Sequence, residues 1–409
     1  MGPLSGIRVL DLSRILAGPW ATQLLADLGA EVIKIEKPGL GDDTRRWGPP
    51  WLADEQGRPS AESAYFLSAN RGKQSLAIDF TVAAGAHLLR ELVKQCQVLV
   101  ENYKVGGLAK YGLDYLSLHE LNPALVYCSI TGFGQTGPYA KRAGYDAAIQ
   151  AQGGLMGITG EPDGAPGGGP QKVGVAVADL MTGMYAATGI LAALRHAQIT
   201  GQGQHIDLAL LDTQVGWLAN QALNYLVGDQ VPQRQGSAHP NITPYQVMPA
   251  ADGHFMLAVG NDSQFQRLCA LLGQPALAVD LRFASNPARV AHRETLIALL
   301  SVPLVKQSVA HWLAQLEALG VPCAPVNSIA QVFADPQVQA RQMRFDLPHA
   351  LGSVPQVANP LKFSHTAIEY HRAPPLLGAD TDAVLSTRLA LDAAEIADLR
   401  AAGVIGAAN

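Results

Sequence analysis

Apolar runs that alternate with helical patterns organise the first third of the chain and limit what it can fold into. Four runs read as short buried strands, IRVLDLS (7–13), AEVIKIEKP (30–38), QVLVENY (97–103) and ALVYCSIT (124–131). Apolar side chains at helical spacing fill residues 18–29, 83–96 and 114–123 between them. Gly29 is the expected C-cap of the first helix, and Pro38 ends the second strand. Strands joined through helices pair in parallel by right-handed crossovers, so the sequence predicts an α/β fold with a doubly wound sheet.

The ends of these strands are where a ligand is expected. Ligands of open α/β sheets bind beyond the carboxyl ends of the parallel strands. The segments that follow the four predicted strands are residues 13–18, 36–38, 101–107 and 131–138. We therefore expect the functional side chains to come from these segments.

The length and the change of pattern along the chain predict a second domain. A chain of 409 residues is long for one hydrophobic core. Residues 150–172 are rich in Gly and Pro and should be irregular. From about residue 226 the pattern changes to turns and short antiparallel strands, and helical patterns follow over about 263–318. We predict a small domain over residues 226–328, inserted between the two parts of a large domain, residues 1–225 and 329–409. The segment 320–337 reads as the return to the large domain.

Charge, cysteine usage and the N-terminal sequence exclude several classes of protein. The net charge of −5 is not that of a general nucleic-acid binder. The four cysteines are widely spaced and form no CxxC motif, which indicates a reduced, cytoplasmic protein without a zinc site. The first residues lack the basic and apolar pattern of a signal peptide. We expect no nucleic-acid or membrane partner, no metal and no permanently bound cofactor.

One charge, Asp179, interrupts the apolar, small-residue segment VGVAVADLMTGMYAATGILAAL (173–194). The segment is long enough to span a membrane, but its carboxylate and polar residues favour a buried helix. An Asp at a helix start is ordinarily an N-cap, a contribution of about 1 kcal/mol. Alternatively, the helix N-terminus keeps the carboxylate ionised, and a dry site beside Gly183, Ala186 and Ala187 makes it a nucleophile. The residues alone leave both interpretations open.

Other catalytic motifs find no support in the sequence. GFGQTG (132–137) has the spacing of a dinucleotide-binding loop, but Pro138 and basic residues follow it instead of a helix. A Gly-x-Ser-x-Gly motif is absent, and spacing singles out none of the eleven histidines as a base. Nor does any pair of carboxylates stand out as the acid and base of a glycosidase.

Long motifs spread over the whole chain resemble the family III CoA-transferases, the CaiB/BaiF and formyl-CoA transferase group. They are PLSGIRVLDLSRILAGPWATQLLADLGAEVIKIEKPGLGDDTR, NRGKQSLAIDF, VLVENYKVGGLAKYGLDY, SITGFGQTGPYAKRAGYDAAIQAQGGLMGITG, VGVAVADLMTGMYAATGILAALRHAQITGQGQHIDLALLD, GVPCAPVNSIAQVFADPQVQARQM and PPLLGADTD. The resemblance implies a Rossmann-like large domain built from both chain ends, a smaller inserted α+β domain, and an interlocked homodimer. The small-domain entry looks similar to members that use succinyl-CoA and dicarboxylates.

The resemblance also implies the chemistry and the catalytic residue. The family's nucleophilic Asp falls on Asp179, which attacks an acyl-CoA thioester to give a mixed anhydride and CoA thiolate. The thiolate returns to form an aspartyl-CoA thioester, and the acceptor carboxylate then takes the CoA. Coenzyme A enters as part of a substrate, and water must be kept out of the site.

The family's CoA contacts carry over position by position. They fall on Leu16, Ala17, Lys37, Ile78, Asp79, Phe80, Thr81, Asn102, Tyr103, Lys104, Lys110 and Tyr145. Lys110 is alternatively a solvated surface lysine, and Asn102 and Tyr145 are alternatively structural. The chain departs from the family at two basic positions, where it has Pro38 and Ala143, with Lys37, Lys141 and Arg142 nearby.

Two further functions remain alternatives. The α-methylacyl-CoA racemases of the same family pair the Asp with a His where this chain has Tyr145, and they carry a Glu near residues 259–262. Two-base racemisation needs a group on each face of the α-carbon, so the missing His favours the transferase. A non-catalytic acyl-CoA-binding protein is the other alternative. In the small domain, His239 and Asn241 are either contacts of the acceptor acid or turn residues.

Overall fold

A computed structural model describes residues 2–406, which form two compact units. The first unit takes the residues up to 154, residues 173–222 and those from 337 on, and the second takes residues 155–172 and 223–336. The boundaries differ from those predicted from the sequence, because residues 155–172 group with the second unit. The Arg234 guanidinium donates to the Gly157 carbonyl, and the Gly236 amide donates to that of Gly160, which ties this irregular segment to residues 234–236.

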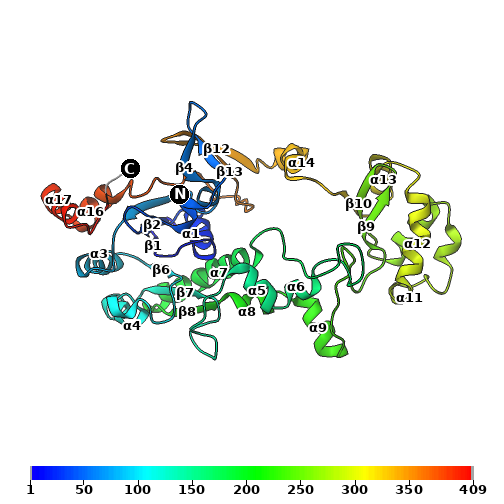
Figure 1. Ribbon diagram of the computed structural model, residues 1–409, viewed down its shortest axis with the longest axis horizontal. Coiled ribbons are helices and arrows are strands. Elements are labelled where there is room, and N and C mark those ends of the chain that lie inside the picture. Colours follow the sequence, from blue (N-terminus) through cyan, green and yellow to red (C-terminus); the bar gives the residue numbers. More distant parts are fainter. Residues whose placement is uncertain (1, 407–409) are drawn as a thin grey trace. The chain divides into compact units, whose positions relative to one another are not determined.

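A six-stranded parallel sheet forms the centre of the first unit (Figure 1). Its strands in spatial order are β5 (Lys73–Ala77), β2 (Glu31–Glu36), β1 (Arg8–Asp11), β6 (Val98–Glu101), β7 (Val126–Thr131) and β8 (His205–Ala209). Every pair is parallel. The predicted α/β fold with a parallel sheet is therefore confirmed. The chain runs outward from β1 in one direction and outward from β6 in the other, so a topological switch point lies between β1 and β6.

Apolar side chains alternate along the strands and cover both faces of this sheet. Val9 belongs to the cluster shared with α1 (Ala17–Asp27), α5 (Asp146–Gln152), α7 (Val177–Thr200) and α8 (Leu210–Gly216). Leu10 belongs to the cluster shared with α3 (Ala83–Val93), α4 (Tyr115–Leu121), α16 (Thr381–Leu389) and α17 (Ala393–Ala401). The last two helices come from the C-terminal part of the chain, so both ends of the sequence build this unit.

Helix α7 packs directly on α1, and its small residues allow the close approach. A Cβ added at Gly183 would lie 2.7 Å from the Ala17 carbonyl oxygen, so only glycine fits there. By length and composition alone α7 would also pass for a membrane span, but half of its most apolar window is buried inside the protein. It is a core helix of the first unit.

Shorter elements complete the two units. The hairpins are β3 (Trp51–Ala53) with β4 (Pro59–Ser63), and β12 (Arg344–His349) with β13 (Gly352–Val357). The short helices are η1 (Asp43–Arg46), α2 (Ala64–Leu67), η2 (Ala109–Tyr111), α6 (Leu155–Ile158), α9 (Ala219–Gly228), α14 (Ile329–Ala334) and α15 (Pro336–Ala340). Of these, η1 and α2 lie close to the functional site.

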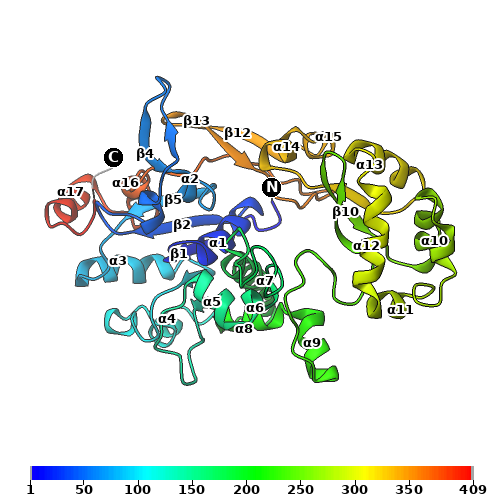
Figure 2. The same ribbon diagram turned by 45° about the vertical axis from the view of Figure 1, so that its right-hand side comes forward.

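The second unit has its own antiparallel sheet and core (Figure 2). Its strands are β9 (Tyr245–Ala250), β10 (Gly253–Ala258) and β11 (Cys323–Pro325), and its helices are α10 (Asp262–Leu271), η3 (Pro275–Ala278), α11 (Asn286–Ala291), α12 (Arg293–Leu304) and α13 (Val309–Ala318). Phe255, Phe265 and Trp312 are buried in its core. The antiparallel strands and helices expected here are confirmed. The return to the first unit was expected too early, because β11 pairs with β10 inside the second unit.

Candidate active site

A pocket of about 650 Å³ opens at the carboxyl ends of β1, β6 and β7 in the first unit. Three of the four segments expected to carry the site contribute to it, while residues 36–38 do not. Its lining residues are Arg14, Ile15, Leu16, Ala17, Asp43, Trp47, Phe80, Asn102, Tyr103, Lys104, Val105, Gly107, Leu108, Lys110, Tyr111, Ile130, Thr131, Gly132, Ala140, Arg142, Ala143, Gly144, Tyr145, Asp179 and Leu210. The pocket lies at the topological switch point, as expected for an open α/β sheet.

Asp179 lies in this pocket, in the first turn of α7, and it is not the helix cap. The N-cap position is Ala176, which supplies no side-chain acceptor. Asp146 of α5 caps the helix instead. Its Oδ1 accepts from the Ala178 amide at 2.8 Å and from the Asp179 amide at 3.3 Å. Within the described part of the chain no group donates a hydrogen bond to the Asp179 carboxylate. The N-cap interpretation of Asp179 is therefore wrong, and its carboxylate is free to react.

The charge state of Asp179 also differs from the expectation. Burial, together with a smaller contribution from the Asp146 carboxylate, raises the pKa of Asp179 to about 7. The dipole of α7 favours an ionised carboxylate, but desolvation and a second carboxylate outweigh it. Near neutral pH the group is thus divided between its acid and carboxylate forms.

An aromatic pair, Trp47 directly after η1 and Tyr65 of α2, lies at this end of the pocket. Trp47 lines the pocket, and its ring packs edge-on against Tyr65 with 5.2 Å between centroids. Burial raises the pKa of Tyr65 to about 12, with a further contribution from Asp179 and Asp146. The hydroxyl therefore stays protonated near the two carboxylates and remains a hydrogen-bond donor.

Eight of the twelve predicted CoA contacts line the pocket, namely Leu16, Ala17, Phe80, Asn102, Tyr103, Lys104, Lys110 and Tyr145. Asn102 has a structural role. Its Oδ1 accepts from the Arg14 amide at 2.9 Å, and its Nδ2 donates to the Arg14 carbonyl at 2.7 Å. It fixes the loop between β1 and α1 from the side of β6.

Aromatic and cationic side chains share the wall formed by the loops after β5 and β6. Phe80 packs edge-on against Tyr103 and Tyr111, with ring centroids 5.6 and 5.7 Å apart. The Lys110 ammonium lies 4.7 Å from the Tyr111 ring centroid. Lys104, Arg14 and Arg142 add further positive charge to the same pocket. Aromatic faces beside several cations suit a ligand with a planar base and phosphate groups.

The other predicted contacts lie away from the pocket lining. Lys37 is exposed, and its carbonyl accepts from the Leu40 and Gly41 amides. Ile78 is buried and bridges to Ile405, while Asp79 accepts hydrogen bonds from the Thr81 amide and hydroxyl.

His239 and Asn241 belong to the second unit. The His239 ring stacks on Tyr245 with 5.1 Å between centroids, and its Nδ1 accepts from the Asn241 amide at 3.1 Å. Burial lowers the pKa of His239, with a further contribution from Arg293.

Three residues of the site were not identified from the sequence. They are Trp47, Tyr65 and Asp146. Arg14 lies within the expected segment 13–18, although it was not singled out there. Asp146 caps a helix that begins 31 residues later in the sequence, and only the tertiary structure brings the two together.

Comparisons with known proteins agree with this geometry. A family model described as CoA-transferase family III matches residues 4–381. The chain is 54% identical over 385 residues to the succinate–glutarate CoA-transferase of Agrobacterium fabrum, covering 94% of this chain and 95% of that protein. It is 42% identical over 404 residues to the human succinyl-CoA:glutarate CoA-transferase, covering 98% and 90% of the two chains. The crystal structure of a CAIB/BAIF family protein from Brucella suis superposes with a TM-score of 0.83 at 50% identity, covering 95% of this chain and 99% of that chain.

Proposed function

Because this chain belongs to CoA-transferase family III, we propose that it moves CoA from succinyl-CoA to a dicarboxylic acid such as glutarate. Relatives named for the succinate–glutarate exchange, which match this chain over nearly its full length, support this choice of substrates. The observation that carries the mechanism is the Asp179 carboxylate, which accepts no hydrogen bond from the described residues and lies in a pocket with cationic and aromatic walls. Asp179 is the proposed nucleophile.

The proposed reaction proceeds through two covalent forms of Asp179. Its carboxylate attacks the thioester carbonyl of succinyl-CoA, the C–S bond breaks, and a succinyl-aspartyl anhydride and CoA thiolate result. The thiolate attacks the aspartyl carbonyl, which releases succinate and leaves an aspartyl-CoA thioester. The acceptor carboxylate attacks this thioester and expels the thiolate again. The thiolate then attacks the acceptor carbonyl of the new anhydride, which frees the acyl-CoA product and the Asp179 carboxylate.

The protein supplies a charge state and a dry environment for these steps. Only the carboxylate form of Asp179 attacks, and its pKa of about 7 makes it a stronger nucleophile than an ordinary Asp. Burial of the anhydride protects it from hydrolysis. The cations Arg14, Lys104, Lys110 and Arg142 are the proposed partners of the CoA phosphates.

The racemase alternative is less well supported by the residues around Asp179. The pocket lining contains no histidine, and Tyr145 occupies the position of the family's second base. Near residues 259–262 the acid is Asp262, whose Oδ1 accepts from the Arg289 guanidinium at 2.7 Å. An ion-paired Asp is a poor proton acceptor, so a second base for the α-carbon is missing among these residues.

The assembly and the location of the protein form part of the same proposal. Large apolar side chains are exposed on α7, at the end of α8 and on α9, including Tyr185, Trp217 and Leu226. Such surfaces mark protein–protein contacts. We propose a homodimer in the cytoplasm, with the acyl-CoA and the acid as its small-molecule partners and with no nucleic-acid or membrane partner.

The covalent step is tested by trapping it. The protein is incubated with succinyl-CoA, treated with hydroxylamine or borohydride, and its peptides are mapped by mass spectrometry. A modification at Asp179 that is absent from Asp179→Ala supports the proposal, and we expect this variant to lose transfer activity by ~1000-fold or more. An unmodified protein together with exchange of the α-proton into deuterated water contradicts it and favours the racemase.

A further inference from the structure

The loop between β1 and α1 holds an unfavourable backbone conformation at the wall of the pocket. Ile15 has φ +70°, in the left-handed region that β-branched residues avoid. Arg14, Ile15, Leu16 and Ala17 all line the pocket that contains Asp179. A conformation of this kind persists only where surrounding groups enforce it.

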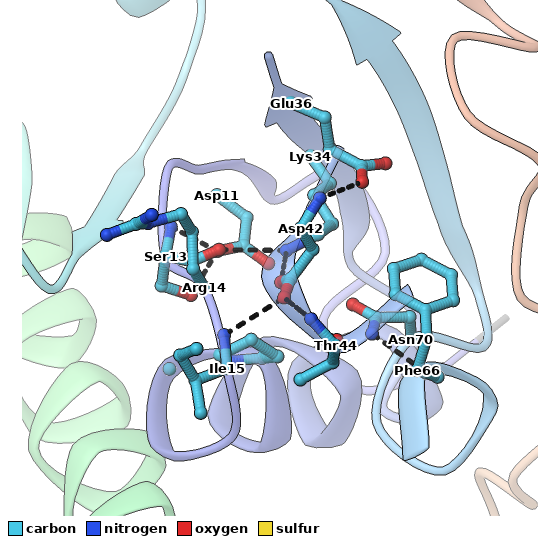
Figure 3. A network of polar contacts seen from close by, with 12 residues as sticks. Asp11, Ser13, Arg14, Ile15, Lys34, Glu36, Asp42, Thr44, Phe66 and Asn70 are labelled. Carbon is cyan, nitrogen blue, oxygen red and sulfur yellow. Dashed lines mark hydrogen bonds and ion pairs between the residues drawn. The ribbon is translucent and has the colours of Figure 1, made fainter. Parts of the chain in front are cut away.

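A buried ion pair enforces it from the side of β2 (Figure 3). The Asp42 Oδ1 accepts from the Ile15 amide at 3.2 Å, and also from the amide and the hydroxyl of Thr44 at 2.9 and 2.8 Å. The Asp42 Oδ2 accepts from the Lys34 Nζ at 2.9 Å, and Lys34 donates to the Ser13 carbonyl at 2.8 Å. The Lys34 and Asp42 side chains are both fully buried. The pair thus holds the loop by hydrogen bonds to the backbone of Ser13 and Ile15, on either side of Arg14.

Further buried charges keep this pair in place. The Glu36 Oε1 accepts from the Asp42 amide at 2.9 Å, and Glu36 is itself bound by the Arg45 guanidinium. Burial opposes the ionisation of Asp42, but the Lys34 charge and the Thr44 hydrogen bonds outweigh it and hold the pKa of Asp42 below its ordinary value. Buried ion pairs contribute little net stability compared with an apolar core, so their presence calls for another explanation. The loop that they hold provides one.

We propose that Asp42 is a positioning residue for the transferase reaction. It keeps Ile15 in the left-handed conformation and so fixes where the Leu16 and Ala17 amides lie at the pocket wall. In the described part of the chain neither amide has a hydrogen-bond acceptor, so both are available to substrate oxygen atoms. This inference rests on the proposed function, because it assigns Asp42 an effect on the reaction at Asp179.

The variant Asp42→Asn weakens the hold on the loop with little change of shape, because one of the two hydrogen bonds, from Lys34 or from Ile15, is lost. An amide side chain has one acceptor oxygen, so in this variant it cannot accept from both Lys34 and Ile15. We expect kcat for the transfer of CoA from succinyl-CoA to glutarate to fall by ~10–100-fold, since a shift of about 1 Å at a reacting centre has effects of this size.

Glycine at position 15 distinguishes positioning from general stability. Glycine adopts positive φ without strain, so Ile15→Gly should no longer need Asp42 to hold the loop. In the double variant Asp42→Asn/Ile15→Gly we expect kcat to return to within ~3-fold of Ile15→Gly alone. Ile15→Ala is the matched control, since it removes the side chain but keeps the Cβ that disfavours positive φ. It should give no rescue.

A second buried pair serves as the control for stability. Asp27 binds Arg71 through both carboxylate oxygens, at 2.8 and 2.6 Å, and it lies outside the Asp179 pocket. Asp27→Asn should lower Tm and leave kcat unchanged. If Asp42→Asn does not fold, the double variant Lys34→Met/Asp42→Leu is tested in its place. Exchanging a buried ion pair for apolar residues often preserves folding. The same loss and the same rescue by Ile15→Gly are expected.

Two results would overturn the inference. One is a folded Asp42 variant with unchanged kcat, and the other is a double variant whose loss equals the product of the two single losses. Failure of the proposed function has a different signature, since the wild-type protein would then form no Asp179 adduct and transfer no CoA.

Discussion

At the scale of the residue, the pairing of Asp179 with Asp146 explains how a carboxylate becomes a nucleophile here. Asp179 stands out in the sequence as the single charge in an apolar, small-residue segment, and the family resemblance implies its role as the nucleophile. The role of Asp146 was not predicted from the sequence, because a cap supplied by another helix leaves no local pattern there. By taking over the cap, Asp146 leaves the Asp179 carboxylate unbound and raises its pKa at the same time.

The pH dependence of the reaction follows from this pair. Since only the carboxylate of Asp179 attacks, kcat/KM for succinyl-CoA should rise with pH and level off above about 7. Asp146→Asn removes the neighbouring negative charge, so it should lower the pKa of Asp179 and move the rise to lower pH. Initial rates across the pH range measure both curves. A rise at the same pH in the variant would contradict the assignment.

The same carboxylate should reduce the stability of the folded protein. The pKa of Asp179 is raised from 3.8 to about 7 on folding, so its ionisation costs stability progressively between these values and fully above them. Asp179→Asn stays neutral and should unfold at higher urea concentration than the wild type above about pH 7.

We expect the free energy of unfolding of Asp179→Asn to exceed that of the wild type by ~2 kcal/mol above about pH 7. This is roughly half of the value that the full pKa shift of Asp179 would give, because the carboxyl is partly solvated. The gain should shrink as the pH falls toward about 4, where the carboxyl is protonated in both states. Urea unfolding of both proteins at several pH values is the measurement. Equal stabilities in alkaline buffer would show that the raised pKa is absent.

At the scale of the element, the sequence predicted the helices and strands that follow simple patterns. β1, β2, β6 and β7 lie within the four runs that were predicted as strands. β5 and β8 were not predicted. Their sequences are KQSLA and HIDLA, and each begins with a polar or charged residue. In β5 the charge is the fully buried Lys73, which its partners Asp11, Asn70 and the Pro19 carbonyl make tolerable.

The contact between α1 and α7 predicts a contrast between two glycines of α7. In Gly183→Ala the new Cβ would lie 2.7 Å from the Ala17 carbonyl oxygen, so the helices must separate. We expect the free energy of unfolding of Gly183→Ala to fall by ~1–3 kcal/mol. We also expect a lower kcat, because Asp179 lies one turn away on the same helix. Gly189→Ala is the matched control, since its Cβ would meet only Ile206 at 3.7 Å. At that position alanine should raise the free energy of unfolding by ~0.5–1 kcal/mol. Equal effects in urea unfolding would contradict the close approach of α1 and α7.

At the scale of the whole molecule, the chain order of the strands determines where the site lies. Because the sheet reverses its direction of growth between β1 and β6, the loops after these strands meet around one pocket. This location was predictable from the sequence, whereas the boundaries between the two units were not. They depend on hydrogen bonds such as that from Arg234 to Gly157, which join segments far apart in the sequence.

The assembly is tested at this same scale. We expect analytical ultracentrifugation to give twice the mass of one chain, with no dissociation at low concentration if the subunits interlock. Trp217→Glu places a charge on the exposed apolar surface of the first unit and should reduce activity and dimer stability together. A fully active monomer would contradict the proposed dimer.

The central claim is that Asp179 itself carries the CoA, and the fate of the acceptor oxygen tests it most directly. In the proposed sequence the acceptor carboxylate attacks the aspartyl thioester, and the thiolate then attacks the acceptor carbonyl, so one acceptor oxygen remains on Asp179. After a single turnover, glutarate labelled with heavy oxygen in its carboxylates, supplied with succinyl-CoA, should therefore make the Asp179 peptide heavier by one isotopic substitution. The label should appear only when both substrates are present. Formation of glutaryl-CoA with an unlabelled Asp179 would mean that CoA passes directly between the acids, and the account of Asp179 as the nucleophile would be wrong.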